Sequence, residues 1–329
     1  MSSLTPQAIL ELARQFMESR ILLTAAELDL FTLLSPGPLS AEEAAGRTGA
    51  DPRALTIVLD ALAAMELLVK REGRYSCPVG VAALLSRDSP QSVLAMVHHM
   101  GHVWRRWSKL TDLVRGRDEA EKSPAVPEPG EIRAFIGAMH AIAETLAPAI
   151  VAAVGAAGAR RLLDVGGASG TYTIAFLRAF PEMKATLFDR PEVVEMARQR
   201  LEEAGLLGRT ALAGGDFYRD EFPGGHDLAF VSAIIHQNSP AQNLDLYRKI
   251  FRALIPGGRI VIRDHVMEPE RTRPRDGAIF AVNMLAATAG GNSYTYDEIR
   301  SGLVQAGFIR VRLIQKGERM DGLIEGFKP

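Results

Sequence analysis

The stretch Arg161-Leu-Leu-Asp-Val-Gly-Gly-Ala-Ser-Gly-Thr171 decides the fold of this chain. Its apolar start predicts a buried parallel strand, and the residues from Thr171 to Phe180 predict a helix. The turn between them lets a ligand approach the backbone, beside the free N–H groups at the start of the helix. Asp164, at the end of the strand, suits a ligand with an ammonium group better than a pyrophosphate. The candidate cofactor-binding glycines are Gly166, Gly167 and Gly170.

Two further acids follow at the ends of the next two predicted strands. The segment Lys184–Asp189 ends in a carboxylate that can accept both hydrogens of a ribose diol. The third strand ends at Asp216, which can accept from an adenine amino group while Phe217 packs on the ring. Each feature alone is common, and a strand-end Asp is often only a helix cap. Together and in order, they indicate that the chain binds S-adenosylmethionine.

The length and composition of the chain limit the classes of protein to which it can belong. With 329 residues, the chain is long enough for about two domains of ~150 residues each. Lys+Arg 38 against Asp+Glu 39 gives no global attraction to nucleic acid or to an anionic membrane. The single cysteine, Cys77, excludes an intrachain disulfide and a cysteine-rich zinc site. The first residues lack the basic-then-apolar profile of a secretory signal, so we expect none, and no apolar stretch reaches the ~20 residues of a membrane span. We expect a cytoplasmic protein.

The chain contains regions with different sequence patterns. Residues 1–120 predict mostly helices, beginning with an amphipathic stretch from Pro6 to about Leu34. Residues 121–154 predict a charged, proline-rich linker and then a helix from Glu131 to about Val154. Residues 155–329 alternate short β-branched runs with helical patterns, which is typical of a doubly wound α/β domain with a parallel sheet.

The first domain has the pattern of a winged helix-turn-helix. Ser40 and Glu43 offer a capping box, a second helix covers Arg53–Met65, and a hairpin turns at Glu72-Gly73. A DNA-reading helix needs cations and polar readers, but this one carries a single arginine, one aspartate and mostly apolar residues. Packing against other helices or a second subunit is therefore the better interpretation.

Nearly the whole chain resembles one enzyme family, in order. The matching segments are LLDVGGASGTYT, LFDRPEVV, GGDFYRDEFPGGHDL, FVSAIIHQNSP, LIPGGRIVIRDHV and NML…GGNSYTYDEI…GF. The region of about 160–265 resembles class I S-adenosylmethionine-dependent methyltransferases. The chain as a whole resembles small-molecule O-methyltransferases with an N-terminal winged-helix dimerisation domain, a group that includes caffeate-type, hydroxyindole and bacterial antibiotic enzymes. The resemblance implies a Rossmann-like doubly wound sheet, a homodimer and methyl transfer to a hydroxyl of an aromatic or polyketide-like acceptor.

His236 is the candidate general base. It follows the expected strand Leu228–Ile235, at the edge where binding crevices of such sheets open. A phenol with a pKa near ~10 is a poor nucleophile while protonated, so a nearby base helps. The catalytic histidine of the family occupies the matching position in a His-Asp-Trp pattern, where this chain has His236-Gln-Asn238. From the residues alone, a histidine there could also cap a helix or line a pocket.

The sequence departs from the plant enzymes around this histidine. A glutamate that orients the histidine in those enzymes is Ser293 here, and a lysine four residues before the histidine is Ser232. A second family glutamate near the C-terminus matches Glu325, which the resemblance makes a catalytic candidate. Asp264 is close enough by topology to contribute, although it is also a natural helix cap.

Candidate acceptor-binding residues lie outside the glycine motif. His98, His99 and His102 could suggest a metal, but only the first and last share a helix face and no third ligand is evident, so we expect no metal site. An aromatic wall around the acceptor is one interpretation of these residues and their neighbours, and plain helix packing is the other. The substrate candidates are Trp104, Phe135, Met139, His140, Asn283 and Met284.

Two kinds of function remain open at this point. One is an enzyme that methylates a hydroxyl, with carbon or nitrogen methylation or hydroxylation as variants of its chemistry. The other is a protein that kept the cofactor fold and lost turnover. The sequence does not distinguish them.

Overall fold

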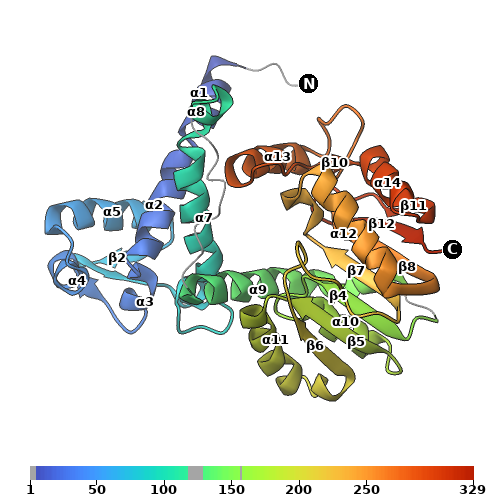
Figure 1. The fold of residues 1–329 in the computed structure, drawn as a ribbon. Coiled ribbons are helices and arrows are strands. Elements are labelled where there is room, and N and C mark those ends of the chain that lie inside the picture. Colours follow the sequence, from blue (N-terminus) through green and yellow to red (C-terminus); the bar gives the residue numbers. More distant parts are fainter. Residues whose placement is uncertain (1–4, 118–128, 156–157) are drawn as a thin grey trace. The chain divides into compact units, whose positions relative to one another are not determined.

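A computed structural model describes residues 5–117, 129–155 and 158–329 of the chain. Within the long helix that begins at Pro129, side chains are described from Ile136 onward, apart from residues 138, 141 and 142. The chain divides into two compact units, Met1–Arg105 and Arg106–Pro329, which we describe one at a time (Figure 1). Most of the expected linker, residues 121–128, lies outside the described residues.

The first unit is mainly helical, with one small sheet. Its elements are α1 (Pro6–Arg14), α2 (Phe16–Glu27), α3 (Leu30–Leu34), β1 (Leu39–Ser40), α4 (Ala41–Thr48), α5 (Pro52–Ala64), β2 (Val69–Arg71), β3 (Arg74–Ser76), α6 (Val79–Leu85) and α7 (Leu94–Trp107), which ends two residues into the second unit. The expected amphipathic stretch at its start forms three helices, α1 to α3. Asp29, in the left-handed region at φ 53°, turns the chain between the second and third.

Local signals predicted the middle of this unit well. Ser40 and Glu43 form the expected capping box of α4, and Gly49 ends that helix with a left-handed φ of 69°. The wing forms as predicted, with β2 and β3 antiparallel, and β1 adds a third strand alongside β3. Leu55, Leu59 and Leu62 of α5 are fully buried in the unit's core. The apolar face of the presumed recognition helix therefore serves packing.

The second unit is an α/β sandwich. Its elements are α8 (Leu110–Val114), α9 (Pro129–Val154), β4 (Arg161–Val165), α10 (Thr171–Ala179), β5 (Lys184–Asp189), α11 (Pro191–Glu203), η1 (Leu207–Arg209), β6 (Thr210–Gly214), β7 (His226–Ser232), η2 (Ile235–Gln237), α12 (Pro240–Ala253), β8 (Leu254–Asp264), β9 (Val266–Met267), α13 (Arg275–Ala287), β10 (Tyr294–Thr295), α14 (Tyr296–Gln305), β11 (Ile309–Gln315) and β12 (Gly322–Phe327).

Seven of these strands form one sheet, in the order β11-β12-β8-β7-β4-β5-β6. The five strands from β8 to β6 are parallel, and β12 and β11 continue the sheet antiparallel. The strand order reverses direction between β4 and β7, which is where doubly wound sheets open a crevice at their carboxyl edge. The expected doubly wound sheet is confirmed.

Alternating side chains build two cores, one on each face of the sheet. Leu163 and Val165 of β4 face α12 and α14 in one core. Leu162 of the same strand faces α9, α10 and α11 in the other core, in agreement with the arrangement in Figure 1. Because Asp164 is two residues from Leu162, its carboxylate lies on the α10 side of the sheet. This side matters for cofactor binding.

One expected boundary was wrong at a functionally important place. The strand predicted over Leu228–Ile235 ends at Ser232, since Ala233 adopts a left-handed φ of 57°. The chain then forms the short helix η2, and His236 lies on it. Apolar residues alone could not distinguish the end of the strand from this turn.

No described helix is long and apolar enough to cross a membrane. Among the side chains that the structure describes, no group of three or more His, Cys, Asp or Glu could hold a metal ion.

Candidate active site

The glycine turn after β4 approaches the sheet closely. Gly166 and Gly170 have left-handed φ values of 67° and 77°. A Cβ on Gly167 would lie 2.6 Å from the Leu187 side chain and 3.0 Å from Asp164 Oδ2. Glycine is therefore required here for both conformation and space.

Asp164 is a buried carboxylate under this turn. It is 2% exposed and accepts a hydrogen bond from Thr173 Oγ1 at 2.6 Å. Burial raises the pKa of Asp164 to about 6. No cation lies within ion-pair distance of it among the described residues, so the ammonium group of a ligand would stabilise the charged form.

The second and third acids end neighbouring strands. Parallel pairing of β4, β5 and β6 brings their carboxyl ends to one edge of the sheet. Asp189 Oδ2 accepts from the Ala168 N–H of the glycine turn at 2.8 Å, and burial raises the pKa of this carboxyl. Asp216 Oδ1 accepts from the Tyr218 N–H at 2.9 Å. The three acids and the turn thus fit an adenosine with an amino-acid tail.

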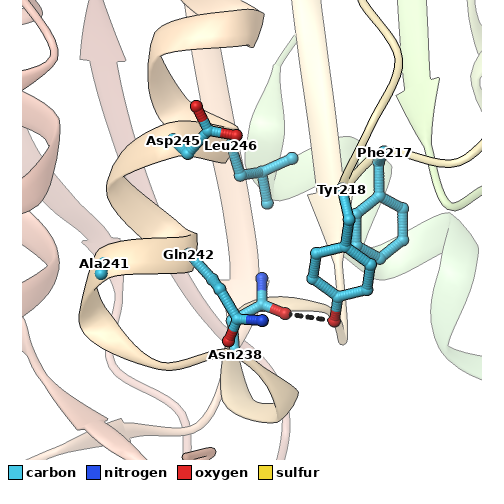
Figure 2. A pocket seen from close by; sticks show the side chains of 7 residues that line it. All are labelled: Phe217, Tyr218, Asn238, Ala241, Gln242, Asp245 and Leu246. Atoms are coloured by element: carbon cyan, nitrogen blue, oxygen red, sulfur yellow. Dashed lines mark hydrogen bonds between the residues drawn. The ribbon is translucent and has the colours of Figure 1, made fainter.

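A pocket with a volume of about 330 Å³ lies beside Phe217 (Figure 2). The Phe217 and Tyr218 rings lie 4.5 Å apart, and the Tyr218 hydroxyl donates to Asn238 Oδ1 at 2.7 Å. The remaining lining residues are Ala241, Gln242, Asp245 and Leu246. Sequence reasoning found Phe217 but missed Tyr218, although it directly follows Phe217 in an aromatic pair.

His236 and Asp264 meet at the carboxyl ends of β7 and β8. His236 Nδ1 lies 3.0 Å from each carboxylate oxygen of Asp264. Because a carboxylate only accepts, Nδ1 carries the proton and Nε2 keeps its lone pair. Asp264 is 1% exposed, and its Oδ1 also accepts the His265 N–H at 2.8 Å. The pair therefore presents a basic nitrogen in a fixed orientation.

Neighbouring segments hold this histidine in place. The Phe280 ring of α13 lies edge-on to the imidazole, with centroids 4.8 Å apart. The Asn292 N–H donates to the His236 carbonyl at 2.8 Å, and a Cβ on Gly291 would collide with that same carbonyl oxygen. Sequence reasoning missed Phe280, which shares a helix face with Asn283 and Met284 at the three- and four-residue spacing.

Glu325 and Ser293 bond to groups other than His236. Glu325 of β12 is aligned with Val261, on the α10 side of the sheet, and pairs with Arg259 at 2.7 Å and Arg312 at 2.6 Å. Asp264 is three residues from Val261 on β8, so its side chain points to the opposite face. Ser293 donates to the Gly277 carbonyl at 2.8 Å. The carboxylate that contacts His236 is Asp264, and this corrects the prediction that Glu325 is a catalytic residue.

The substrate candidates are spread over both units. In the second unit, Asn283 Oδ1 accepts from Trp107 Nε1 at 3.0 Å, and Met284 is buried nearby on the same helix. His140 Nδ1 lies 2.7 Å from Thr171 Oγ1, next to the glycine turn. Met139 is half-buried, and the side chain of Phe135 lies outside the described residues. Trp104 belongs to the first unit, where the Arg20 guanidinium lies 5.1 Å from its ring. Their role in acceptor binding stays a prediction.

Comparisons with known proteins agree with this geometry. A sequence model of the O-methyltransferase domain matches residues 123–309, and one of the O-methyltransferase dimerisation domain matches residues 10–86. The 3-hydroxy-5-methyl-1-naphthoate 3-O-methyltransferase of Streptomyces sahachiroi is 31% identical over 98% of this chain and 95% of its own length. The tetracenomycin polyketide synthesis 8-O-methyl transferase TcmO of Streptomyces glaucescens is 32% identical over 93% of this chain and 92% of its own length.

A solved structure extends the likeness to the cofactor. Human N-acetylserotonin methyltransferase, crystallised with S-adenosylmethionine, superposes with a TM-score of 0.81 at 27% identity and covers 100% of this chain and 99% of its own. The expected family and cofactor are confirmed. The chain belongs to the O-methyltransferase family with an N-terminal dimerisation domain, and it is an S-adenosylmethionine-dependent methyltransferase.

Proposed function

We propose that the protein transfers a methyl group from S-adenosylmethionine to a hydroxyl of an aromatic or polyketide-like small molecule, with His236 as the general base. The observation that carries the proposal is the hydrogen bond from His236 Nδ1 to the buried Asp264 carboxylate. That bond leaves Nε2 free to accept a proton.

The cofactor residues have distinct tasks in this proposal. S-adenosylmethionine supplies an electrophilic methyl group on a positive sulfonium. Asp164 pairs with its ammonium group, and Asp189 accepts the ribose hydroxyls. Asp216 accepts from the adenine amino group while Phe217 packs on the ring. The glycine turn at Gly166, Gly167 and Gly170 allows the close approach that these contacts need.

The histidine removes the proton of the acceptor. As the acceptor oxygen bonds to the methyl carbon, its proton moves to His236 Nε2, and the carbon–sulfur bond breaks to give a neutral thioether. Asp264 stabilises the imidazolium that results. Positioning and water exclusion complete the catalysis, since the leaving group needs no further activation.

The acceptor class rests on relatives and on the surroundings of the base. The two bacterial relatives are named for a naphthoate and for tetracenomycin polyketide synthesis. Phe280 contacts His236, and Met284 is buried one helical turn further along α13. A ring and a thioether near the base suit a flat aromatic acceptor.

The working unit in this proposal is a homodimer. The dimerisation-domain match covers residues 10–86. The helices α1 and α2 expose an apolar stripe that a second subunit could cover: Ile9, Leu10, Leu12, Phe16 and Met17 are each 47–58% exposed. In a monomer these apolar side chains are exposed to water, which is unfavourable in free energy, and pairing with a second subunit would bury them.

A methyl-transfer assay tests the function. Purified protein is incubated with S-adenosylmethionine labelled on the methyl group and a panel of hydroxynaphthoates, hydroxyanthraquinones and matched aminoarenes. We expect label in an aryl methyl ether, identified by NMR. Label on nitrogen or carbon would overturn the hydroxyl assignment. Calorimetric binding of the cofactor without turnover on any acceptor would favour the interpretation that the chain has lost its chemistry.

A further inference from the structure

Arg263 is a buried cation, and none of the described carboxylates lies beside it as an ion-pair partner. It lies near the end of β8, it is 8% exposed, and its Nη1 donates to Ser232 Oγ at 3.0 Å. Its Nε is buried and makes no hydrogen bond to any described residue, and no described carboxylate pairs with it. A buried, unpaired guanidinium is costly, so a charged partner for it is expected from outside the chain.

The Tyr172 hydroxyl is a second buried group without a partner. Tyr172 is the second residue of α10, directly after the glycine turn. Its hydroxyl makes no hydrogen bond of good geometry to the described residues, and the Ser232 side chain is a polar neighbour close enough to affect its pKa. The Arg263 guanidinium lies 5.4 Å from the Tyr172 ring. Burial raises the pKa of the Tyr172 hydroxyl, and the charge of Arg263 works against that rise. Two unsatisfied donors thus lie together behind the glycine turn.

Strand register brings these groups to the side of the sheet on which Asp164 lies. Asp164 is paired with Phe230 of β7, and Ser232, two residues further, is paired with Arg263 of β8. Side chains two apart on a strand share a face, so Asp164, Ser232 and Arg263 all lie on the α10 side. The Tyr172 ring, 5.0 Å from that of Phe230, covers the same place.

Arg263 reaches the end of the neighbouring strand β7. Arg263 lies directly across the ladder from Ser232 and donates to its hydroxyl. The positive charge of Arg263 is therefore held beside the carboxyl end of β7.

We propose that Arg263, assisted by the Tyr172 hydroxyl, binds the α-carboxylate of S-adenosylmethionine. The carboxylate and the ammonium group of an amino acid are attached to one carbon. An acid on β4 and a guanidinium on β8, on the same face and on either side of β7, match that pair of charges. Asp164 holds the ammonium group and Arg263 the carboxylate, so the methionine tail is fixed from both sides. The assignment rests on the cofactor site proposed above.

Binding measurements with two ligands test the assignment. S-adenosylhomocysteine carries the carboxylate, and its decarboxylated analogue keeps the ammonium group, sulfur and adenosine. Calorimetry gives the Kd of each for the wild-type protein, Arg263→Met and Arg263→Lys. We expect Arg263→Met to weaken S-adenosylhomocysteine by about 10–100-fold, the range for a lost charge-assisted hydrogen bond, and to leave the analogue within about 2-fold. Arg263→Lys should recover part of the loss.

Controls separate binding from folding. Arg312→Met removes an arginine from the same sheet that is 72% exposed, and it should leave both affinities unchanged. Tyr172→Phe should weaken only S-adenosylhomocysteine, by a smaller factor. Thermal unfolding of each ligand-free variant checks that it is folded. If Arg263→Met does not fold, Arg263→Gln retains donors for Ser232 and serves in its place.

Three results would overturn the proposal. They are an equal loss of affinity for both ligands in the Arg263 variants, an unchanged affinity for S-adenosylhomocysteine, and a wild-type protein that binds both ligands equally well. A wild-type protein that binds neither ligand would instead refute the proposed cofactor site as a whole.

Discussion

Replacing Asp264 by asparagine should convert His236 from a base into a hydrogen-bond donor at the wrong nitrogen. Asp264 Oδ1 already accepts the His265 N–H at 2.8 Å. In Asp264→Asn that backbone donor retains the amide oxygen, so the amide NH₂ faces His236 Nδ1. An NH₂ group can only donate, so one amide oxygen must serve both the His265 N–H and Nδ1. The tautomer in which Nδ1 accepts and Nε2 carries the proton is then favoured.

The size of the effect follows from the geometry. Both carboxylate oxygens lie 3.0 Å from Nδ1, and Asp264 is 1% exposed, so no water can restore the original tautomer. A reversed tautomer in a buried His–Asp pair lowers turnover by roughly 10³–10⁴-fold. The Kd for S-adenosylhomocysteine should change little, because the pair lies on the face of the sheet opposite Asp164.

Single-turnover methyl transfer with the acceptor found in the panel is the assay. The protein is saturated with cofactor, and its affinity is measured separately by calorimetry. Ser293→Ala is the matched control, since that hydroxyl donates its hydrogen bond to the Gly277 carbonyl. A rate in Asp264→Asn within about 10-fold of the wild-type rate would refute the argument that Asp264 sets the tautomer.

Three further changes test other parts of the site and fold. Burial raises the pKa of Asp164 to about 6, and only its charged form pairs with an ammonium group. The Kd for S-adenosylhomocysteine should therefore stay constant above pH 6 and rise about tenfold per pH unit below it. A Kd that calorimetry finds unchanged down to pH 5 would contradict this. Glu325→Gln removes the carboxylate that pairs with Arg259 and Arg312, so the free energy of unfolding should fall by about 3 kcal/mol in denaturant titration. Turnover per folded molecule should be retained. A variant of full stability that has lost turnover would contradict this structural role. The double variant Leu10→Glu and Phe16→Glu should lower the molar mass measured by light scattering from that of a dimer to that of a monomer. Val304→Glu, at another exposed apolar site, should leave the mass unchanged. An unchanged mass in the double variant would exclude this stripe from the interface.

Local patterns in the sequence predicted the cofactor side of the fold. The glycine turn, the strand ends at Asp189 and Asp216 and the capping box at Ser40 each depend on a few adjacent residues. Such features follow from backbone conformation and hydrogen-bonding capacity, so they are visible in one sequence. Their order along the chain then specified a doubly wound sheet.

The partner of His236 could not be predicted in the same way. Glu325 and Asp264 are both acids on strands near the C-terminus, and only register and face distinguish them. Register depends on how β8 and β12 pair across the sheet, which no local pattern encodes. Arg263 was missed for the same reason: in sequence it is one charged residue in an apolar strand, and its lack of a partner appears only when β7 and α10 are packed around it.

In the proposed reaction, His236 takes the proton of the acceptor hydroxyl. The most direct measurement is the single-turnover rate of methyl transfer in His236→Gln, with the cofactor saturating and its Kd measured on the same sample. We predict a rate at least about 10²-fold below that of the wild-type protein, with the Kd within a few-fold. A wild-type rate in that variant would contradict the account.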